Sequence, residues 1–122
     1  MTTSQRAAHA PARLDLADRL PEFYASLTQQ RQFRLEQLQE LAEEAARSSP
    51  ETHDVHAEVA EILRTSATTA LTEVEAALDR LHGGRFGMCE RCAKHISHER
   101  LEILPMSRYC TPCQHAREMR SV

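Results

Sequence analysis

The chain has 122 residues, of which 27% are charged and 4% aromatic, and it contains no tryptophan. That length allows one domain rather than two large ones, and so few aromatic side chains argue against a thick globular core. Abundant Ala and Leu with only three glycines is typical of long helices. Residues 1–11 contain no continuous apolar run, so we expect no secretory signal, no membrane segment and a cytoplasmic protein with reduced thiols.

The net charge of −3 hides a strong division along the chain. Residues 36–79 carry eleven acidic and two basic side chains, whereas residues 80–122 carry four acidic and eight basic ones. Nucleic acid phosphates would repel the middle of the chain. None of the expected helices is basic in the manner of a base-reading helix, so we expect no sequence-specific DNA binding.

Residues 1–13 are small and polar and lack periodicity, which predicts a flexible N-terminal tail. A helical segment is expected over residues 14–82. Its first long helix runs from Pro21, which suits a first helical turn, to about Arg47. The predicted apolar stripe follows steps of three and four residues. Its members are Leu20, Tyr24, Leu27, Arg31, Leu35, Leu38, Ala42 and Ala45.

A break at residues 48–51 separates this helix from a second one. Ser49 resembles an N-cap and Pro50 a first helical residue, while Gly83 and Gly84 end the helix after His82. Its predicted stripe is Val55, Val59, Leu63, Ala67, Leu71, Val74, Leu78 and Leu81. The short break favours an antiparallel hairpin with its tip at about 47–51, although an intermolecular coiled coil remains an alternative.

All four cysteines fall in two Cys-x-x-Cys pairs, Cys89 with Cys92 and Cys110 with Cys113, separated by seventeen residues. Two such pairs are typical of a site in which four thiolates surround one zinc ion. Four protein ligands leave no position for water or substrate, so the site is expected to be structural. Two disulfides or a redox-active pair are the alternatives.

Residues 83–122 are therefore predicted to form a four-cysteine zinc finger. Ile96 and the run 101–104 are expected to form short strands or turns, and a final helix is expected over about Pro112–Arg120. Three nearby histidines, His95, His98 and His115, are expected to be surface residues rather than ligands. The predicted fold class is all-α with a small zinc module: a long two-helix hairpin, a zinc finger and a short terminal helix.

Several residues are interleaved with the cysteines in a recognisable order. They are Phe86-Gly87, Glu90, Ile96, Arg100-Leu101-Glu102, Pro105 and Tyr109. Together with the cysteine pairs, this pattern resembles the DksA/TraR family of bacterial zinc-finger transcription regulators. The resemblance implies direct binding to RNA polymerase, with the hairpin entering the secondary channel and acidic tip residues acting near the catalytic magnesium.

Two departures from the family pattern concern function. The tip motif Asp-x-x-Asp-x-Ala is matched here only by Glu51 and Asp54, followed by His56, so their role at the tip is a hypothesis. Two basic positions that hold guanosine tetraphosphate in the best-known members are Leu104 and Gln114 here. Neither side chain can pair with phosphate as a cation does, so we expect weak or absent binding of this alarmone.

The sequence thus predicts a monomeric, non-enzymatic regulator of RNA polymerase with one structural zinc ion. The alternative is a zinc-capped coiled-coil scaffold without polymerase activity. No Ser/His/Asp arrangement, phosphate-cradling glycine loop or open metal site supports an enzyme.

Overall fold

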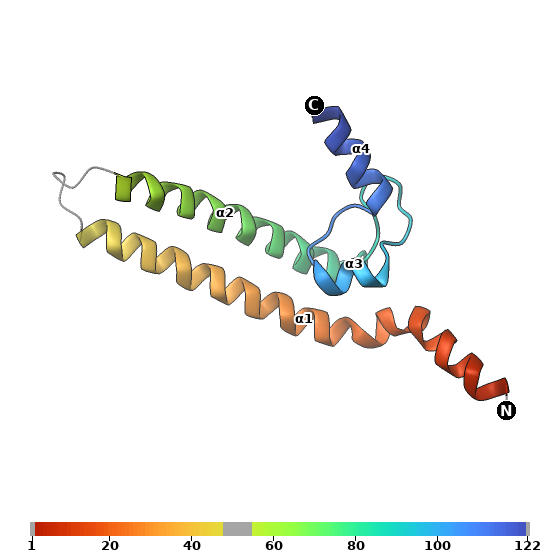
Figure 1. The fold of residues 1–122 in the computed structure, drawn as a ribbon. Helices are drawn as coiled ribbons and strands as arrows, with labels where there is room; N and C mark the ends of the chain where they lie inside the picture. The colour runs from red at the N-terminus through yellow and green to blue at the C-terminus, as the bar shows by residue number, and fades with distance from the viewer. Residues whose placement is uncertain (1, 48–54, 122) are drawn as a thin grey trace.

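The structure, a computed structural model, describes residues 2–47 and 55–121, and only the backbone of residues 2–15. These residues form four helices: α1 (Thr2–Arg47), α2 (Val55–His82), α3 (His98–Ile103) and α4 (Thr111–Ser121). Figure 1 shows α1 and α2 side by side as an antiparallel hairpin, with α3 and α4 gathered where α2 ends. The predicted fold class is confirmed.

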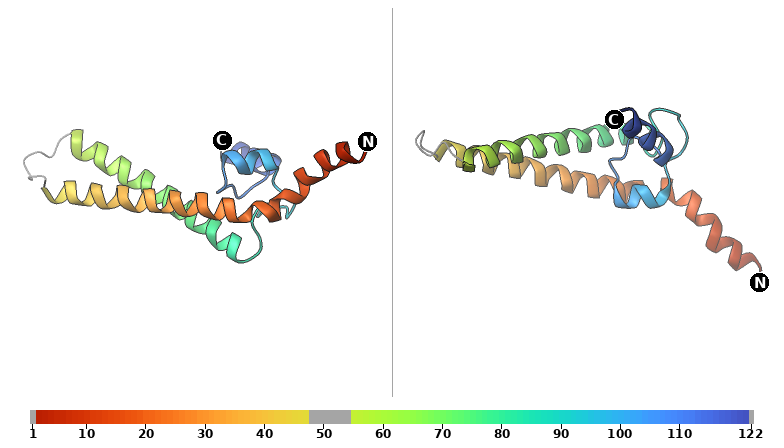
Figure 2. Two further views of the ribbon diagram at one scale, coloured as in Figure 1. Left: turned by 90° about the horizontal axis from the view of Figure 1, so that it is seen from below. Right: turned by 45° about the horizontal axis from the view of Figure 1, so that its top comes forward.

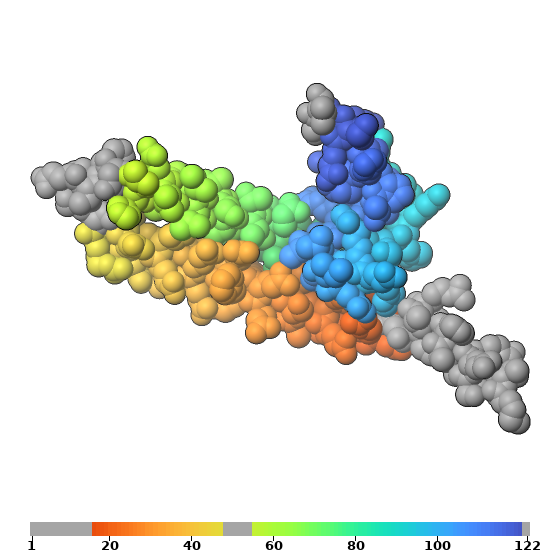
Figure 3. Space-filling model, in the orientation of Figure 1, coloured from red at the N-terminus to blue at the C-terminus, as the bar shows by residue number. Residues whose placement is uncertain are grey.

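The far end of the hairpin projects away from a compact C-terminal unit, which we call the knob (residues 83–121), in both further views (Figure 2). The 28 residues of α2 give this helix a length of about 42 Å. In the space-filling view, the two helices touch along the hairpin and the knob sits against its base (Figure 3). The molecule is therefore a rod attached to a small head.

The base of the hairpin and the knob share one apolar core. Phe23 and Leu27 of α1 pack with Val74 and Ala77 of α2, and all four are at most 5% exposed. The knob adds its own buried side chains to this cluster, namely Phe86, Cys89, Ile96 and Leu101. The rings of Phe23 and Phe86 are 5.1 Å apart. Each large side chain buried here stabilises the fold by about 1.5–3 kcal/mol.

The far half of the hairpin is packed differently from its base. None of the described residues in 28–47 and 55–66 is buried. The predicted stripe is wrong here, because Val55, Val59 and Leu63 are 68%, 47% and 43% exposed. The partly buried positions of α2 in this half are instead Ala57, Ala60 and Arg64.

The N-terminal part of α1 also differs from the prediction. The helix begins at Thr2 rather than near Pro21, so the backbone over residues 2–13 is helical and not a loose tail. Four alanines between residues 7 and 12 favour helix, whereas Pro11 inside α1 lacks an N–H donor and opposes it. The predicted end of the helix at Arg47 agrees with the structure.

The end of α2 follows the predicted glycine rule. Gly84 has a positive φ of 74°, and the Arg85 N–H donates to the Arg80 carbonyl at 2.8 Å. The Gly84 N–H donates to the Leu81 carbonyl at 3.3 Å. These two bonds form a Schellman motif, which satisfies the last helical carbonyls and turns the chain towards the zinc-binding segment.

The expected strands or turns at Ile96 and residues 101–104 are corrected in part. Residues 98–103 form the short helix α3, and Ser97 caps it by accepting a hydrogen bond from the Arg100 N–H at 3.2 Å. Leu101 is fully buried on this helix. Among the described residues, the β-type pairing is a single bridge between Met88 and His95.

A substitution at Gly87 tests how closely α1 approaches the knob. Gly87 has φ +82°, and a Cβ there would lie 3.0 Å from Leu16 Cδ2 and 3.3 Å from Leu101 Cδ1. We expect Gly87→Ala to lower the free energy of unfolding by about 2–3 kcal/mol, from backbone strain plus crowding. Urea denaturation would measure this loss.

The matched control is Gly84→Ala. Gly84 has a similar φ of 74°, but a Cβ there would meet no atom within 4 Å. The free energy of unfolding of this variant should fall only by the contribution of backbone strain, about 1 kcal/mol. Equal losses for the two variants would show that α1 does not approach Gly87 as the structure describes.

Candidate metal centre

The first cysteine pair lies on a tight loop of the knob. The Cys89 N–H donates to the Lys94 carbonyl at 2.8 Å, and the Ala93 N–H donates to the Cys89 carbonyl at 2.9 Å. Ala93 has φ 64°, in the left-handed region that glycine usually fills. The loop folds back so tightly that Cys89 and Cys92 present their sulfurs on one side.

The second pair spans the start of α4. Cys110 precedes the helix and Cys113 lies in its first turn, and the Gln114 N–H donates to the Cys110 carbonyl at 2.9 Å. The predicted start of this helix at about Pro112 agrees with the observed Thr111 within one residue. The helix therefore holds the second pair rigidly against the first loop.

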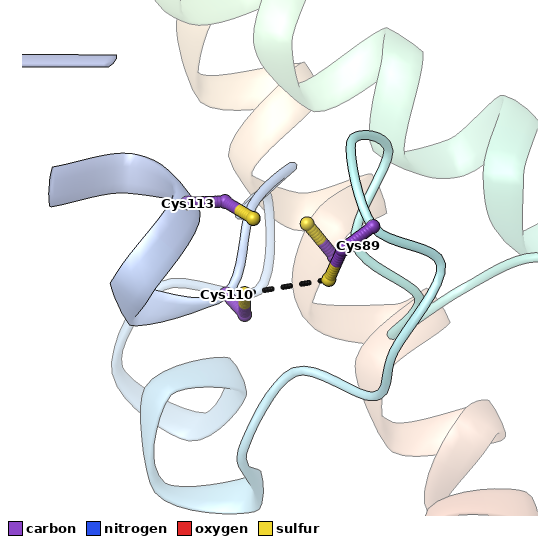
Figure 4. A group of neighbouring side chains, drawn as sticks. Cys89, Cys110 and Cys113 are labelled. Carbon is purple, nitrogen blue, oxygen red and sulfur yellow. Dashed lines mark hydrogen bonds between the residues drawn. The ribbon is translucent and has the colours of Figure 1, made fainter. Parts of the chain in front are cut away.

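The four sulfurs converge on one point. All lie within 4.8 Å of one another, and Cys92 Sγ is 3.7 Å from Cys110 Sγ. Figure 4 shows the side chains of Cys89, Cys110 and Cys113 turned towards one another. A tetrahedral zinc ion with Zn–S bonds of about 2.3 Å would separate its sulfurs by about 3.8 Å. The donor set and its spacing therefore fit zinc.

The thiols of this cluster differ in acidity. Burial raises the pKa of Cys89, but hydrogen bonds from the backbone of Cys92, Cys110 and Arg91 outweigh it and bring the pKa down to about 6. Hydrogen bonding to Cys110, together with burial, raises the pKa of Cys113 to about 12. Four thiolates at this spacing repel one another unless a cation neutralises them, so metal binding would release protons.

The arrangement suits a structural metal rather than a catalytic one. Four sulfurs complete a tetrahedron and leave no open position for a substrate. Cys89 is 3% exposed and belongs to the core that the knob shares with the hairpin. Among the described residues, the cluster consists of the four cysteines, and none of His95, His98 and His115 belongs to it.

Comparisons with known proteins agree with this geometry. Residues 84–118 match the family model of the prokaryotic DksA/TraR C4-type zinc finger. An uncharacterised protein of Aquifex aeolicus (strain VF5) is 42% identical over 43 residues. That match covers 35% of this chain and 30% of the relative, so it spans less than a third of the relative's length.

A solved structure matches over most of the chain. Transcription factor DksA2 from Pseudomonas aeruginosa matches with a TM-score of 0.71 and covers 85% of this chain and 86% of its own, at 22% identity. The chain is thus a helical hairpin with a four-cysteine zinc finger. Its zinc-finger segment is similar to the DksA/TraR zinc finger, the whole has the fold of DksA2, and its cofactor is one structural zinc ion.

The other predicted functional positions are placed as follows. Glu51, Asp54 and the expected tip at 47–51 lie outside the described residues, except for Arg47 at the end of α1. Leu104 follows α3 and is 45% exposed, and the Gln114 side chain donates to Glu118 at 3.1 Å on α4.

Sequence reasoning missed Arg80, the one buried charged residue among those described. It is 4% exposed, and its guanidinium donates to the carbonyls of Met106 and Ser107 at 3.2 and 3.3 Å and to Glu90 at 3.3 Å. A basic residue in the last turn of a helix ordinarily faces solvent. One sequence feature could have predicted the burial of Arg80. It lies three residues after Ala77, on the side of α2 that faces the core.

Proposed function

We propose that this chain is a transcription regulator that binds RNA polymerase directly and inserts the far end of its hairpin into the secondary channel. The observation that carries the proposal is the rod-and-head shape, in the fold of a transcription factor, with a DksA/TraR zinc finger as its head. In this proposal residues 14–82 form the helical segment that enters the channel, and residues 83–122 form the zinc finger. Glu51 and Asp54 act at the tip of the hairpin.

Charge supports entry into such a channel. Exposed carboxylates run along the far half of the hairpin on both helices: Glu36, Glu40, Glu43, Glu58 and Glu61. A rod of this charge would be repelled by DNA and attracted by a passage lined with basic groups and magnesium. Electrostatic attraction of this kind would speed association and orient the rod before contact.

In this proposal the zinc ion has a structural role. We assign Cys89, Cys92, Cys110 and Cys113 as the ligands of the structural zinc, which ties α4 to the base of the hairpin. The protein itself would then perform no catalysis and would act as a monomer in the cytoplasm, where thiols stay reduced. Leu104 and Gln114 offer no cation to guanosine tetraphosphate, so the regulator should act with little dependence on this alarmone.

A crosslinking experiment tests the proposal. The zinc-loaded full-length chain, with a photoreactive residue at the exposed Val55, should recover core RNA polymerase and crosslink to the walls of the secondary channel. A photoreactive residue at Met119, which is 67% exposed on α4, is the control and should crosslink outside the channel. Failure to recover polymerase would overturn the function, and Val55 crosslinks elsewhere would overturn the mechanism.

A second candidate is a self-associating scaffold, and one observation favours it. Val55, Val59, Ile62 and Leu63 form an exposed apolar ridge on α2, between 43% and 68% exposed. Two such ridges could pair as in a coiled coil. Sedimentation would decide between the candidates, because a concentration-independent mass of 13.8 kDa excludes the scaffold.

A further inference from the structure

The far half of α2 carries an apolar surface that the packing of the hairpin does not bury. The apolar ridge, made of Val55, Val59, Ile62 and Leu63, is between 43% and 68% exposed. At about 100° per residue, these four side chains fall on one side of α2 within less than three helical turns. Single apolar residues are common on protein surfaces, whereas a continuous apolar patch marks an interaction site.

The apolar ridge has the spacing of a second coiled-coil seam. Val55, Val59 and Ile62 follow one another by steps of four and three residues, which is the spacing of alternating a and d positions. On α2 the seam with α1 uses Ala57 and Ala60 instead, which are partly buried. Val59 and Ala60 are adjacent, so their side chains point about 100° apart around the helix. One side of α2 thus meets α1, and another is left for a further helix.

The rest of the described chain lies away from the apolar ridge. Figure 1 shows the start of α2 at the end of the hairpin opposite to the knob, and the N-terminal part of α1 extends beyond the knob in the other direction. Both views of Figure 2 show the same arrangement. Over residues 2–47 and 55–121, neither the knob nor the N-terminal part of α1 therefore reaches the ridge. A helix that covers it must come from another chain.

Charge selects the kind of helix that fits. Glu58 is exposed and directly precedes Val59, which places it at the g position beside the ridge, where coiled-coil partners present the opposite charge. Glu58 also lies in the first turn of α2, where a negative charge stabilises a helix, but this role does not account for the apolar side chains next to it.

The acidic character extends beyond Glu58. Residues 36–79 carry eleven acidic and two basic side chains. A second copy of this chain on the ridge would bring two acidic rods together, and their charges would repel. An anionic membrane surface would repel the ridge in the same way. A basic helix is attracted instead, and complementary charge speeds its association and fixes its orientation.

We propose that the apolar ridge binds a basic amphipathic helix of another protein, which packs on α2 as a third helix of the hairpin. Apolar side chains of that helix cover Val59 and Ile62, and a lysine or arginine beside them pairs with Glu58. The apolar contact supplies most of the affinity, and the charge selects the partner. This inference does not rest on the proposed polymerase binding, and its test contains no polymerase.

Titration calorimetry on the zinc-loaded full chain tests the proposal. The probe is a synthetic helical peptide of about two heptads, with leucine at a and d and lysine at e and g. We expect this lysine peptide to bind, and the same peptide with glutamate at e and g to bind at least about tenfold more weakly. Glu58→Lys should reduce the preference for the lysine peptide by about threefold, because the pair is at the surface.

Substitution of the ridge itself separates apolar docking from general attraction of a basic peptide. Val59→Gln/Ile62→Gln should weaken binding of the lysine peptide by about tenfold or more. Met119→Gln is the matched control, because Met119 on α4 and Ile62 are both 67% exposed, and it should change binding less than about twofold. Far-UV circular dichroism and thermal unfolding must match the unchanged chain, which separates a lost surface from a misfolded hairpin.

Four outcomes would overturn the proposal. The lysine peptide does not bind, or it binds the double variant as tightly as the unchanged chain, so that the acidic rod alone attracts it. A mass in sedimentation that rises with concentration, and no longer does so in the double variant, would show that a second copy covers the ridge. Binding to vesicles of neutral and anionic lipid that the double variant loses would show that the ridge meets a membrane.

Discussion

Cys92→Ser should lower the affinity of the chain for zinc by more than about 100-fold, because even a lost outer-shell partner lowers metal affinity about 10–100-fold. Zinc binding supplies much of the folding free energy of small metal modules. In this chain the metal links the first cysteine loop to the start of α4, with Cys110 just before that helix and Cys113 in its first turn. Its loss should therefore unfold α3 and α4 before the hairpin.

The size of the change in helix content distinguishes partial from complete unfolding. α3 and α4 contain 6 and 11 residues, against 46 and 28 in α1 and α2. Unfolding of the knob alone should remove about a fifth of the helix signal in far-UV circular dichroism. A larger loss is expected on warming, because Phe86 and Leu101 of the knob also cover the base of the hairpin.

The control for this experiment is His95→Ser. His95 lies on the same loop, is exposed and is outside the four-sulfur cluster, so this variant should keep its zinc. Zinc content would be measured by mass spectrometry under native conditions. If Cys92→Ser kept one zinc ion per chain at unchanged affinity, the assignment of the four ligands would be wrong.

The metal centre could be predicted because its signal is local. Two short cysteine pairs define the donor set without any knowledge of how the helices pack. The end of α2 at His82 was also predictable, because glycine marks helix ends through its own backbone preference. Signals of this kind do not depend on the tertiary structure.

The hairpin seam could be predicted only near its base, where Ala67, Leu71 and Val74 are all at least partly buried. The predicted stripe on α2 reached these residues from Val55 by steps of four. Each step of four turns about 40° beyond a full helical turn, so such a stripe drifts around the helix. The observed seam runs from Leu71 through Ala67, Arg64 and Ala60 to Ala57 in alternating steps of four and three, which is the coiled-coil average of 3.5.

On both helices the prediction placed the wrong apolar residues in the seam between α1 and α2. Val55, Val59 and Leu63 are larger and more apolar than the alanines that face α1, yet they are exposed. On α1, Phe23 is 5% exposed and its neighbour Tyr24 is 43% exposed, and only the tertiary fold, through Phe86, selects between them. Which of two adjacent apolar residues is buried depends on the partner surface, which composition does not reveal.

Arg80→Met should lower the free energy of unfolding by about 2–3 kcal/mol, measured by urea denaturation of the zinc-saturated chain. Methionine keeps much of the apolar side chain but removes the donors to Met106 and Ser107. Those carbonyls would lose their partner at the junction between α2 and the knob. The loss is limited because Glu90 is 36% exposed and keeps Arg108 within 3.5 Å.

Arg31→Met is the matched control for Arg80→Met. Arg31 also pairs with a glutamate, Glu75 at 3.1 Å, but both side chains are nearly half exposed. Water screens such a pair, so its loss should cost no more than about 1 kcal/mol. If Arg31→Met and Arg80→Met lowered the free energy of unfolding equally, the burial of Arg80 at the junction would not add to the stability of the fold. A larger loss at Arg80 that persists in the Glu90→Gln background would show that the two carbonyls, rather than the ion pair, hold the knob on the hairpin.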